Sequence, residues 1–165
     1  MCWTLSASSS FCCDRQLPAA LRDLPRAPGT YALLVHVAQE KDIGVGRLGA
    51  TRFAAGFYVY VGSGLGPGGL AARLARHLGA RRKPSWHIDY LLNEVPVIDV
   101  IWDCSGKRLE CTWMRVLLEI PVIEVAVPGF GASDCQCPAH LAFLGASHYG
   151  RWNTLRVRLT NERGD

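Results

Sequence analysis

The chain has 165 residues, of which 49% are hydrophobic and 19% are charged. This length and composition predict one folded domain with a core of its own, and they exclude a disordered chain. No apolar run approaches the roughly 18 residues that a membrane-spanning helix needs, and residues 1–13 lack the basic start and continuous apolar stretch of a secretory signal. We therefore expect a cytoplasmic protein, whose seven cysteines are reduced thiols or metal ligands rather than disulfides.

The net charge is modest, at +4, but the basic residues are unevenly placed. Five of them fall within eleven positions: Arg73, Arg76, Arg81, Arg82 and Lys83. A local basic patch of this kind suits a polyanion such as nucleic acid better than a uniformly basic surface would. A solvated helix face is the alternative interpretation of the same residues.

The first part of the chain predicts two strands. Residues 1–24 are rich in serine and are expected to form a loosely ordered leader, so that residues 25–165 make up a single domain. Residues 29–37 are strongly apolar and predict a buried strand, whereas residues 43–49, with three glycines, predict a short hairpin or a loop insertion. Residues 57–61 are all aromatic or β-branched and predict the second strand.

Helices are predicted in the second part. Leu70, Leu74 and Leu78 fall on one stripe, which predicts a helix over residues 70–78. A helix, a strand and a helix are then expected over residues 87–93, 97–102 and 109–118. The order β-β-α-α-β-α predicts the α+β class: a small antiparallel three-stranded sheet flanked by helices, with an irregular C-terminal extension from about residue 121.

A glycine-rich segment between the second strand and the first helix invites another interpretation. Residues 64–69 (GLGPGG) fit the pattern G-x-G-x-x-G of dinucleotide-binding folds, and Asp89 follows Gly69 by twenty residues. In those folds the acidic residue ends a second parallel strand, but residues 81–86 (RRKPSW) do not form one. We therefore interpret the glycines as a flexible turn.

Four short patterns resemble the GIY-YIG nucleases. They are GTY at residues 29–31, YVG at residues 60–62, RLARH at residues 73–77, and Glu110 at the start of a later helix. The resemblance covers roughly residues 28–120, and the order of the elements agrees. It implies a metal-dependent endonuclease that hydrolyses DNA phosphodiester bonds, with Tyr31, Tyr60, Arg73 and Glu110 as its catalytic residues.

Two further segments, WHIDYLL at residues 86–92 and GFGASDCQC at residues 129–137, are similar to an uncharacterised branch of this superfamily. Members of that branch are sometimes found fused to endonuclease III-type repair proteins. The resemblance therefore implies a role in DNA repair, with DNA and DNA-repair proteins as partners.

The residue types fit this chemistry on physical grounds. Glu110 could hold one Mg²⁺ or Mn²⁺ through a single carboxylate, with waters and phosphate completing the coordination. Arg73 offers phosphate a planar fork of donors. Tyr31 or Tyr60 could orient the attacking water or act as general base, and on adjacent antiparallel strands they could share a face. A tyrosine pKa near ~10 is too high for a base at neutral pH, so we expect Arg73 or the metal to lower it.

A second group of residues is expected to bind the substrate: Arg76, His77, Arg81, Arg82, Lys83 and His87. His77, His87 and Asp89 could also add metal or phosphate contacts. The chain departs from the family in two ways. The two tyrosines are 29 positions apart, which requires an insertion around residues 42–55, and Asp134 is the nearest substitute for the family's late asparagine. A non-catalytic module that binds nucleic acid or a partner on the same scaffold is the alternative function.

A separate metal site is also predicted. Cys135, Cys137 and His140 fall within six residues, and Cys111 follows Glu110 directly. Four such ligands could close a tetrahedral zinc site that pins the C-terminal part of the chain to the helix at residues 109–118. Buried reduced cysteines that pack as small hydrophobic residues are the alternative.

Overall fold

The computed structural model describes residues 24–79, 83–147 and 149–161. The strands are β1 (Thr30–Val37), β2 (Lys41–Gly44), β3 (Ala50–Phe53), β4 (Gly56–Ser63), β5 (Val97–Asp103), β6 (Glu124–Val125) and β7 (Leu141–Gly145). The α-helices are α1 (Gly69–Leu78), α2 (His87–Leu92), α3 (Glu110–Leu118) and α4 (Tyr149–Asn161), and a short 3-10 helix, η2, spans Gly46–Leu48. The leader predicted for residues 1–24 lies outside the described residues, except for Leu24, which packs against the core.

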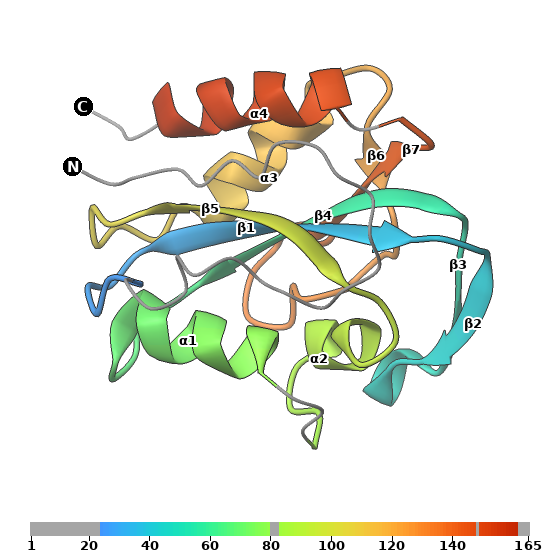
Figure 1. The fold of residues 1–165 in the computed structure, drawn as a ribbon, viewed down its shortest axis with the longest axis horizontal. Helices are drawn as coiled ribbons and strands as arrows, with labels where there is room; N and C mark the ends of the chain where they lie inside the picture. The colour runs from blue at the N-terminus through green and yellow to red at the C-terminus, as the bar shows by residue number, and fades with distance from the viewer. Residues whose placement is uncertain (1–23, 80–82, 148, 162–165) are drawn as a thin grey trace.

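Five strands form one antiparallel sheet in the order β5-β1-β4-β7-β6, and β2 pairs with β3 separately (Figure 1). The prediction of a three-stranded sheet is therefore wrong, although the α+β class is right. The predicted strands correspond to β1, β4 and β5. The sheet is larger because β7 hydrogen-bonds to the other edge of β4, where Val59 lies opposite Ala142. An unpaired edge on so apolar a strand would leave backbone groups exposed, and β7 satisfies them.

The C-terminal extension is ordered, so the prediction of an irregular extension is also wrong. The residues after 121 supply β6, β7 and the 13-residue helix α4. Trp152, Leu155 and Leu159 repeat at helical spacing along α4, and all three are buried. Polar and basic residues surround this narrow stripe, so the helix owes its stability to packing against α3 and the sheet rather than to its own sequence.

The insertion between the two tyrosine strands folds as a hairpin, one of the two alternatives predicted for residues 43–49, and its strands extend to Lys41 and Phe53. β2 and β3 pair in antiparallel register, with Lys41 opposite Phe53, and Phe53 and Val45 are buried in the core. β1 and β4 still pair along their whole length, beginning with Thr30 opposite Ser63. The additional residues therefore enlarge the core without interrupting the strands that carry the tyrosines.

The sheet is buried on both faces, and each face has its own apolar core. Along β1, Tyr31, Leu33 and Val35 belong to one core, whereas Ala32 and Leu34 belong to the other. Helices α1 and α2 cover the first face, and α3 and α4 cover the second (Figure 1). Burial on both sides explains why β1 is a continuous apolar run instead of an alternating one.

The helices of the middle of the chain agree with the sequence. Those predicted over residues 70–78, 87–93 and 109–118 are confirmed to within one residue at each end. In the part of the chain that the structure describes, no helix is long and apolar enough to cross a membrane.

Candidate active site and metal cluster

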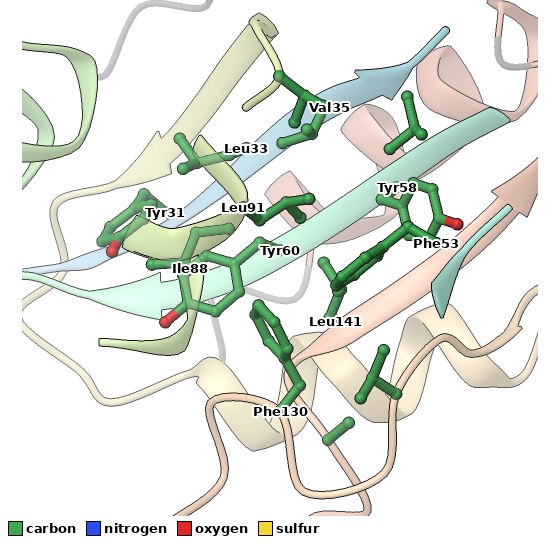
Figure 2. Packing of buried hydrophobic residues seen from close by; sticks show 14 of the residues in the cluster. Tyr31, Leu33, Val35, Phe53, Tyr58, Tyr60, Ile88, Leu91, Phe130 and Leu141 are labelled. Atoms are coloured by element: carbon green, nitrogen blue, oxygen red, sulfur yellow. The ribbon is translucent and has the colours of Figure 1, made fainter. Parts of the chain in front are cut away.

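Tyr31 and Tyr60 lie next to each other on the face of the sheet that α1 and α2 cover (Figure 2). Tyr31 is opposite Gly62 and Leu33 is opposite Tyr60, so the two phenols are diagonal neighbours, with ring centroids 6.4 Å apart. Gly62 makes this arrangement possible, because a Cβ atom there would lie 2.5 Å from Tyr31 Oη and 3.0 Å from Tyr60 Cε1. The two tyrosines therefore share a face, as expected.

A chain of hydrogen bonds runs from Tyr31 through His77 to Asp89. Tyr31 Oη lies 2.8 Å from His77 Nε2, and His77 Nδ1 lies 3.0 Å from Asp89 Oδ1. A carboxylate only accepts hydrogen bonds, so the contact with Asp89 places a proton on Nδ1, and in the neutral imidazole the Nε2 lone pair then faces the phenol. Tyr31 therefore donates to His77, which in turn donates to Asp89.

Asp89 is held in its ionised form by the groups around it. Burial alone would raise the pKa of Asp89, but the hydrogen bonds that it accepts outweigh burial and hold the pKa well below its usual value. The donors are His77, the backbone N–H groups of Ser85 and Trp86, and Arg76, whose Nη2 lies 3.1 Å from Asp89 Oδ2. A fixed negative charge thus stands behind the His77 ring.

The two phenols are less accessible and less acidic than the sequence suggested. Only 1% of Tyr31 and 7% of Tyr60 is exposed. Burial raises the pKa of Tyr31 well above its ordinary value; neighbouring Tyr60 adds to the rise, and Arg73 opposes it without reversing it. Burial likewise raises the pKa of Tyr60. Arg73 thus acts in the expected direction, but its effect on the pKa is smaller than that of burial, and both phenols are neutral hydrogen-bond donors.

Trp86 precedes α2 and contacts both arginines of the α1 motif. The guanidinium carbons of Arg73 and Arg76 lie 4.0 Å and 4.5 Å from the centroid of the Trp86 ring. These distances are typical of cation–π contacts. The ring also meets His77 in an edge-to-face arrangement, with centroids 5.8 Å apart. The two arginines are thereby held beside the hydrogen-bonded chain of Tyr31, His77 and Asp89.

Glu110 lies in the first turn of α3, where the helix dipole favours a negative charge. The residue is only 7% exposed, and within the described residues its Oε2 atom has no hydrogen-bond partner. Arg108 Nε lies 3.9 Å from that oxygen. The charges of Glu110 and Arg73 act on both phenols in opposite directions, because Glu110 raises the pKa of Tyr31 and Tyr60 and Arg73 lowers it. A buried carboxylate oxygen without a donor is suited to a cation.

Cys111, Cys135, Cys137 and His140 form a compact cluster that can hold a metal ion. Their ligand atoms all lie within 4.8 Å of one another, and His140 Nε2 is 3.4 Å from Cys135 Sγ and 3.9 Å from Cys111 Sγ. The first cysteine comes from α3, and the other three ligands come from the loop before β7. The convergence of these four residues, predicted from their spacing, is confirmed.

Without a cation, Cys137 and Cys111 are protonated thiols. Burial raises the pKa of Cys137 to about 12, and hydrogen bonding with the neighbouring thiols Cys111 and Cys135 adds to the rise. Three thiolates so close together repel one another, and a bound cation removes that obstacle. Burial lowers the pKa of His140, which favours the neutral imidazole that metals bind. These three cysteines are free thiols, whereas Cys104 is disulfide-bonded, contrary to the expectation of reduced cysteines.

A family described as a domain of unknown function, DUF123, matches residues 30–157. The chain belongs to the DUF123 family. The matched range contains both tyrosine strands, the site residues of α1, α2 and α3, and the whole Cys3His cluster. No curated protein and no solved structure matches the chain.

In this DUF123 domain His87 makes a contact within the fold. Its Nδ1 accepts a hydrogen bond from the backbone N–H of Gly131 at 3.0 Å, and its ring packs on Phe130 with centroids 5.5 Å apart. Gly131 has a positive φ of 74°, and a Cβ atom there would lie 3.0 Å from Tyr60 Cε2. His87 therefore holds the backbone at Gly131 against the ring of Tyr60.

The remaining predicted residues lie at the margin of the site or outside the described ranges. Asp134, the substitute for the family's asparagine, is an exposed residue whose Oδ2 lies 3.5 Å from Arg108 Nη1. Lys83 is exposed, and its carbonyl accepts a hydrogen bond from Arg76. Arg81 and Arg82 fall outside the described residues.

Sequence reasoning did not assign Trp86 to the site, and within the proposed site it considered Asp89 as a metal or phosphate ligand. The structure instead makes Asp89 the partner of His77. The one local signal is its position in the first turn of α2, which is typical of a residue that caps a helix. Nothing in the spacing from His77 to Asp89 predicts that their side chains meet, because they lie on different helices.

Proposed function

We propose that this DUF123 domain is a metal-dependent endonuclease that hydrolyses phosphodiester bonds of DNA through a site of the GIY-YIG type. The observation that carries the proposal is the hydrogen-bonded chain of Tyr31, His77 and Asp89. Arg73 and the buried carboxylate of Glu110 act on the phenol of that chain. A cytoplasmic location and a role in DNA repair, beside repair proteins, belong to the same proposal and rest on the sequence resemblance.

In the proposed reaction Tyr31 is the base that takes a proton from the attacking water. Because its pKa is raised, the phenol is protonated at neutral pH. It can act as a base only after its own proton has passed to a neighbouring acceptor. His77 Nε2 is that acceptor at 2.8 Å, and the imidazolium that forms is stabilised by the carboxylate of Asp89. The proton of the water then passes to the phenolate oxygen as the water oxygen attacks phosphorus and the bond from phosphorus to the leaving oxygen breaks. The leaving alkoxide takes up a proton from solvent, and His77 releases the proton that it gained, which restores the site.

The other groups serve the phosphate. Arg73 can bind two phosphoryl oxygens through its planar fork. The neutral phenol of Tyr60 can donate a hydrogen bond to a third. The Oε2 atom of Glu110, which accepts no hydrogen bond from the described residues, fits a hard divalent cation, Mg²⁺ or Mn²⁺. When bound, such a cation neutralises the charge that develops on the phosphoryl and leaving oxygens.

A non-catalytic module that binds nucleic acid is the second candidate function. The observation in its favour is the burial of Tyr31 and Tyr60, which leaves little of either ring exposed to a substrate. The arginines around Trp86 would serve such a module equally well. Both functions predict an affinity for DNA that falls steeply as salt rises, so binding alone does not separate them. Only the nuclease predicts turnover of the bound DNA.

The substitution Glu110→Gln separates the two functions. It removes the charge that would hold the divalent cation but keeps the size of the side chain. We expect it to abolish nicking of supercoiled plasmid in Mg²⁺ or Mn²⁺ while leaving the affinity for the same DNA in Ca²⁺ nearly unchanged. Glu119→Gln, at an exposed position at the end of the same helix, is the matched control and should cleave as the wild type does.

The wild-type protein should be tested on duplex, single-stranded, branched and damaged DNA. Cleavage of none of these, together with salt-dependent binding, would identify the non-catalytic module. Nicking by Glu110→Gln at the wild-type rate would refute the role of this carboxylate.

We also propose that the Cys3His cluster holds zinc. Thiolates and imidazole are the ligands that zinc prefers, and the ligand atoms of a tetrahedral site lie roughly 3.5–3.8 Å apart, so the cluster needs only a small contraction. Four protein ligands leave no open position, which is the pattern of a structural rather than a catalytic site. Elemental analysis of protein purified without a histidine tag should find one equivalent of zinc, and less than about a tenth of an equivalent would refute the proposal.

A further inference from the structure

Trp86 lies at the surface end of a series of aromatic rings that begins in the core. The rings of Tyr31 and His77 have centroids 5.8 Å apart, and the same distance separates those of His77 and Trp86. Tyr31 is almost fully buried, but 40% of Trp86 is exposed. The other tryptophans within the described residues, Trp102, Trp113 and Trp152, are all buried. Trp86 is thus the tryptophan among them that is not needed to fill the core.

The surroundings of Trp86 are positively charged. Arg73 and Arg76 both place a guanidinium over the ring, and Lys83 is exposed three residues before it. Arg76 is paired with Asp89. Arg73, in contrast, forms no ion pair with any of the described residues, so its charge remains available to an anion. The partly exposed ring of Trp86 and the guanidinium of Arg73 are in contact, so an anion that draws Arg73 away from the ring would uncover a flat apolar surface beside it.

We propose that Trp86 stacks on an unpaired nucleobase of the DNA strand whose phosphate Arg73 binds. This inference rests on the proposed function for the role of Arg73 as a phosphate ligand. The bases of an intact duplex stack on one another and offer no free face, whereas a bulged, flipped or single-stranded base does. The preferred substrate is therefore a DNA with an unpaired base next to the scissile phosphate.

A positioning role is the competing explanation for Trp86. In that case the ring only holds Arg73 and Arg76 in place, and its loss weakens binding to every DNA by the same factor. Stacking predicts a selective loss instead, because only a DNA with a free base gains from the ring. The ratio of two affinities, with and without that base, separates the two explanations.

The experiment compares two labelled duplexes that differ in one group. One carries a single bulged adenine, and the other carries a bulged abasic residue at the same place. Fluorescence anisotropy in Ca²⁺ measures binding of the full chain without turnover. We expect the wild type to bind the adenine bulge roughly 5- to 100-fold more tightly than the abasic bulge, as is typical of stacking on an aromatic side chain. Trp86→Ala should bring this ratio close to one, and Trp86→Phe should retain most of it.

Ile98→Ala is the matched control, because Ile98 is a similarly exposed apolar residue on β5. It should keep the wild-type ratio. A second measurement does not depend on the folding of the alanine variant. The adenine bulge should quench the indole fluorescence of the wild type more strongly than the abasic bulge does, and Trp86→Phe should remove that difference.

Two results would overturn the inference: a wild-type ratio near one, or a ratio that is unchanged in Trp86→Ala because the substitution weakens binding of both duplexes equally or not at all. Because binding is measured without turnover, a base-dependent affinity in a protein that cleaves nothing would uphold the stacking site and refute only the nuclease function. Cleavage of DNA by a protein whose affinity shows no preference for a free base would uphold the nuclease function and refute only the stacking site.

Discussion

The carboxylate of Asp89 connects three parts of the site through hydrogen bonds. It accepts from His77 and Arg76 of α1 and from the backbone before α2. Its pKa is lowered in the folded protein because these donors outweigh burial. A group of this kind stabilises the fold at pH values above its unfolded pKa of ~3.9, and that contribution is lost as the pH falls toward the folded pKa.

Asp89→Asn should therefore make the free energy of unfolding depend less on pH in the acid range. We expect the free energy of unfolding of the wild type to fall between about pH 5 and pH 2, and the asparagine variant, less stable at pH 7, to fall less over the same range. Urea denaturation at a series of pH values measures both. Asp134→Asn, which removes an exposed carboxylate, should keep the wild-type slope. Parallel curves for Asp89→Asn and the wild type would contradict the prediction.

At the scale of the elements, α4 is tied to the edge strand β5 by one carboxylate. Asp99 accepts a hydrogen bond from Trp152 Nε1 at 2.9 Å and forms an ion pair with Arg156. The side chains of Asp99 and Arg156 are only 17% and 15% exposed, so water can replace this pair only in part. The polar contact complements the apolar stripe through which α4 packs on α3.

Removing that carboxylate should loosen the C-terminal helix. We expect Asp99→Asn to lower the free energy of unfolding by about 1–3 kcal/mol, since it removes the negative charge that pairs with Arg156 and weakens the hydrogen bond accepted from Trp152. Chemical denaturation measures the loss, and amide exchange should rise in α4 more than in β1. Asp42→Asn is the control, because Asp42 pairs with Arg52 in an exposed position and its loss should have little effect. Equal behaviour of the two variants would show that Asp99 does not anchor the helix.

At the scale of the molecule, the Cys3His cluster joins segments that the sheet alone does not hold together. Cys111 belongs to α3, whereas Cys135, Cys137 and His140 belong to the loop that leads into β7. The same loop carries Gly131, which lies against the ring of Tyr60. A metal in the cluster would therefore stabilise both the C-terminal part of the sheet and one wall of the tyrosine site.

Removal of zinc should accordingly destabilise the whole domain. Because the proposed ion binds the folded state and not the unfolded one, we expect a strong chelator to lower the Tm by at least about 5 °C. Cys137→Ser should lower the Tm similarly, and the chelator should then have no further effect. Thermal unfolding followed by circular dichroism measures this. A Tm that does not respond to the chelator in zinc-loaded protein would contradict a structural role.

Local patterns in the sequence predicted a large part of this protein. The leucine stripe of α1 predicted a helix and the aromatic run of β4 predicted a strand, because periodicity and side-chain shape act within a few residues. Tyr31 and Tyr60 were placed on one face because strands alternate strictly. The close spacing of Cys135, Cys137 and His140 likewise predicted a common cluster, since so short a loop cannot separate them.

Only the tertiary structure decided the rest. The pairing of β7 with β4 and the docking of α4 depend on which edge and which face remain uncovered, and no local pattern carries that information. The partnership of His77 with Asp89 arises where two helices meet. The raised pKa of Tyr31 follows from burial, because desolvation is a property of everything packed around a group rather than of its neighbours in the chain.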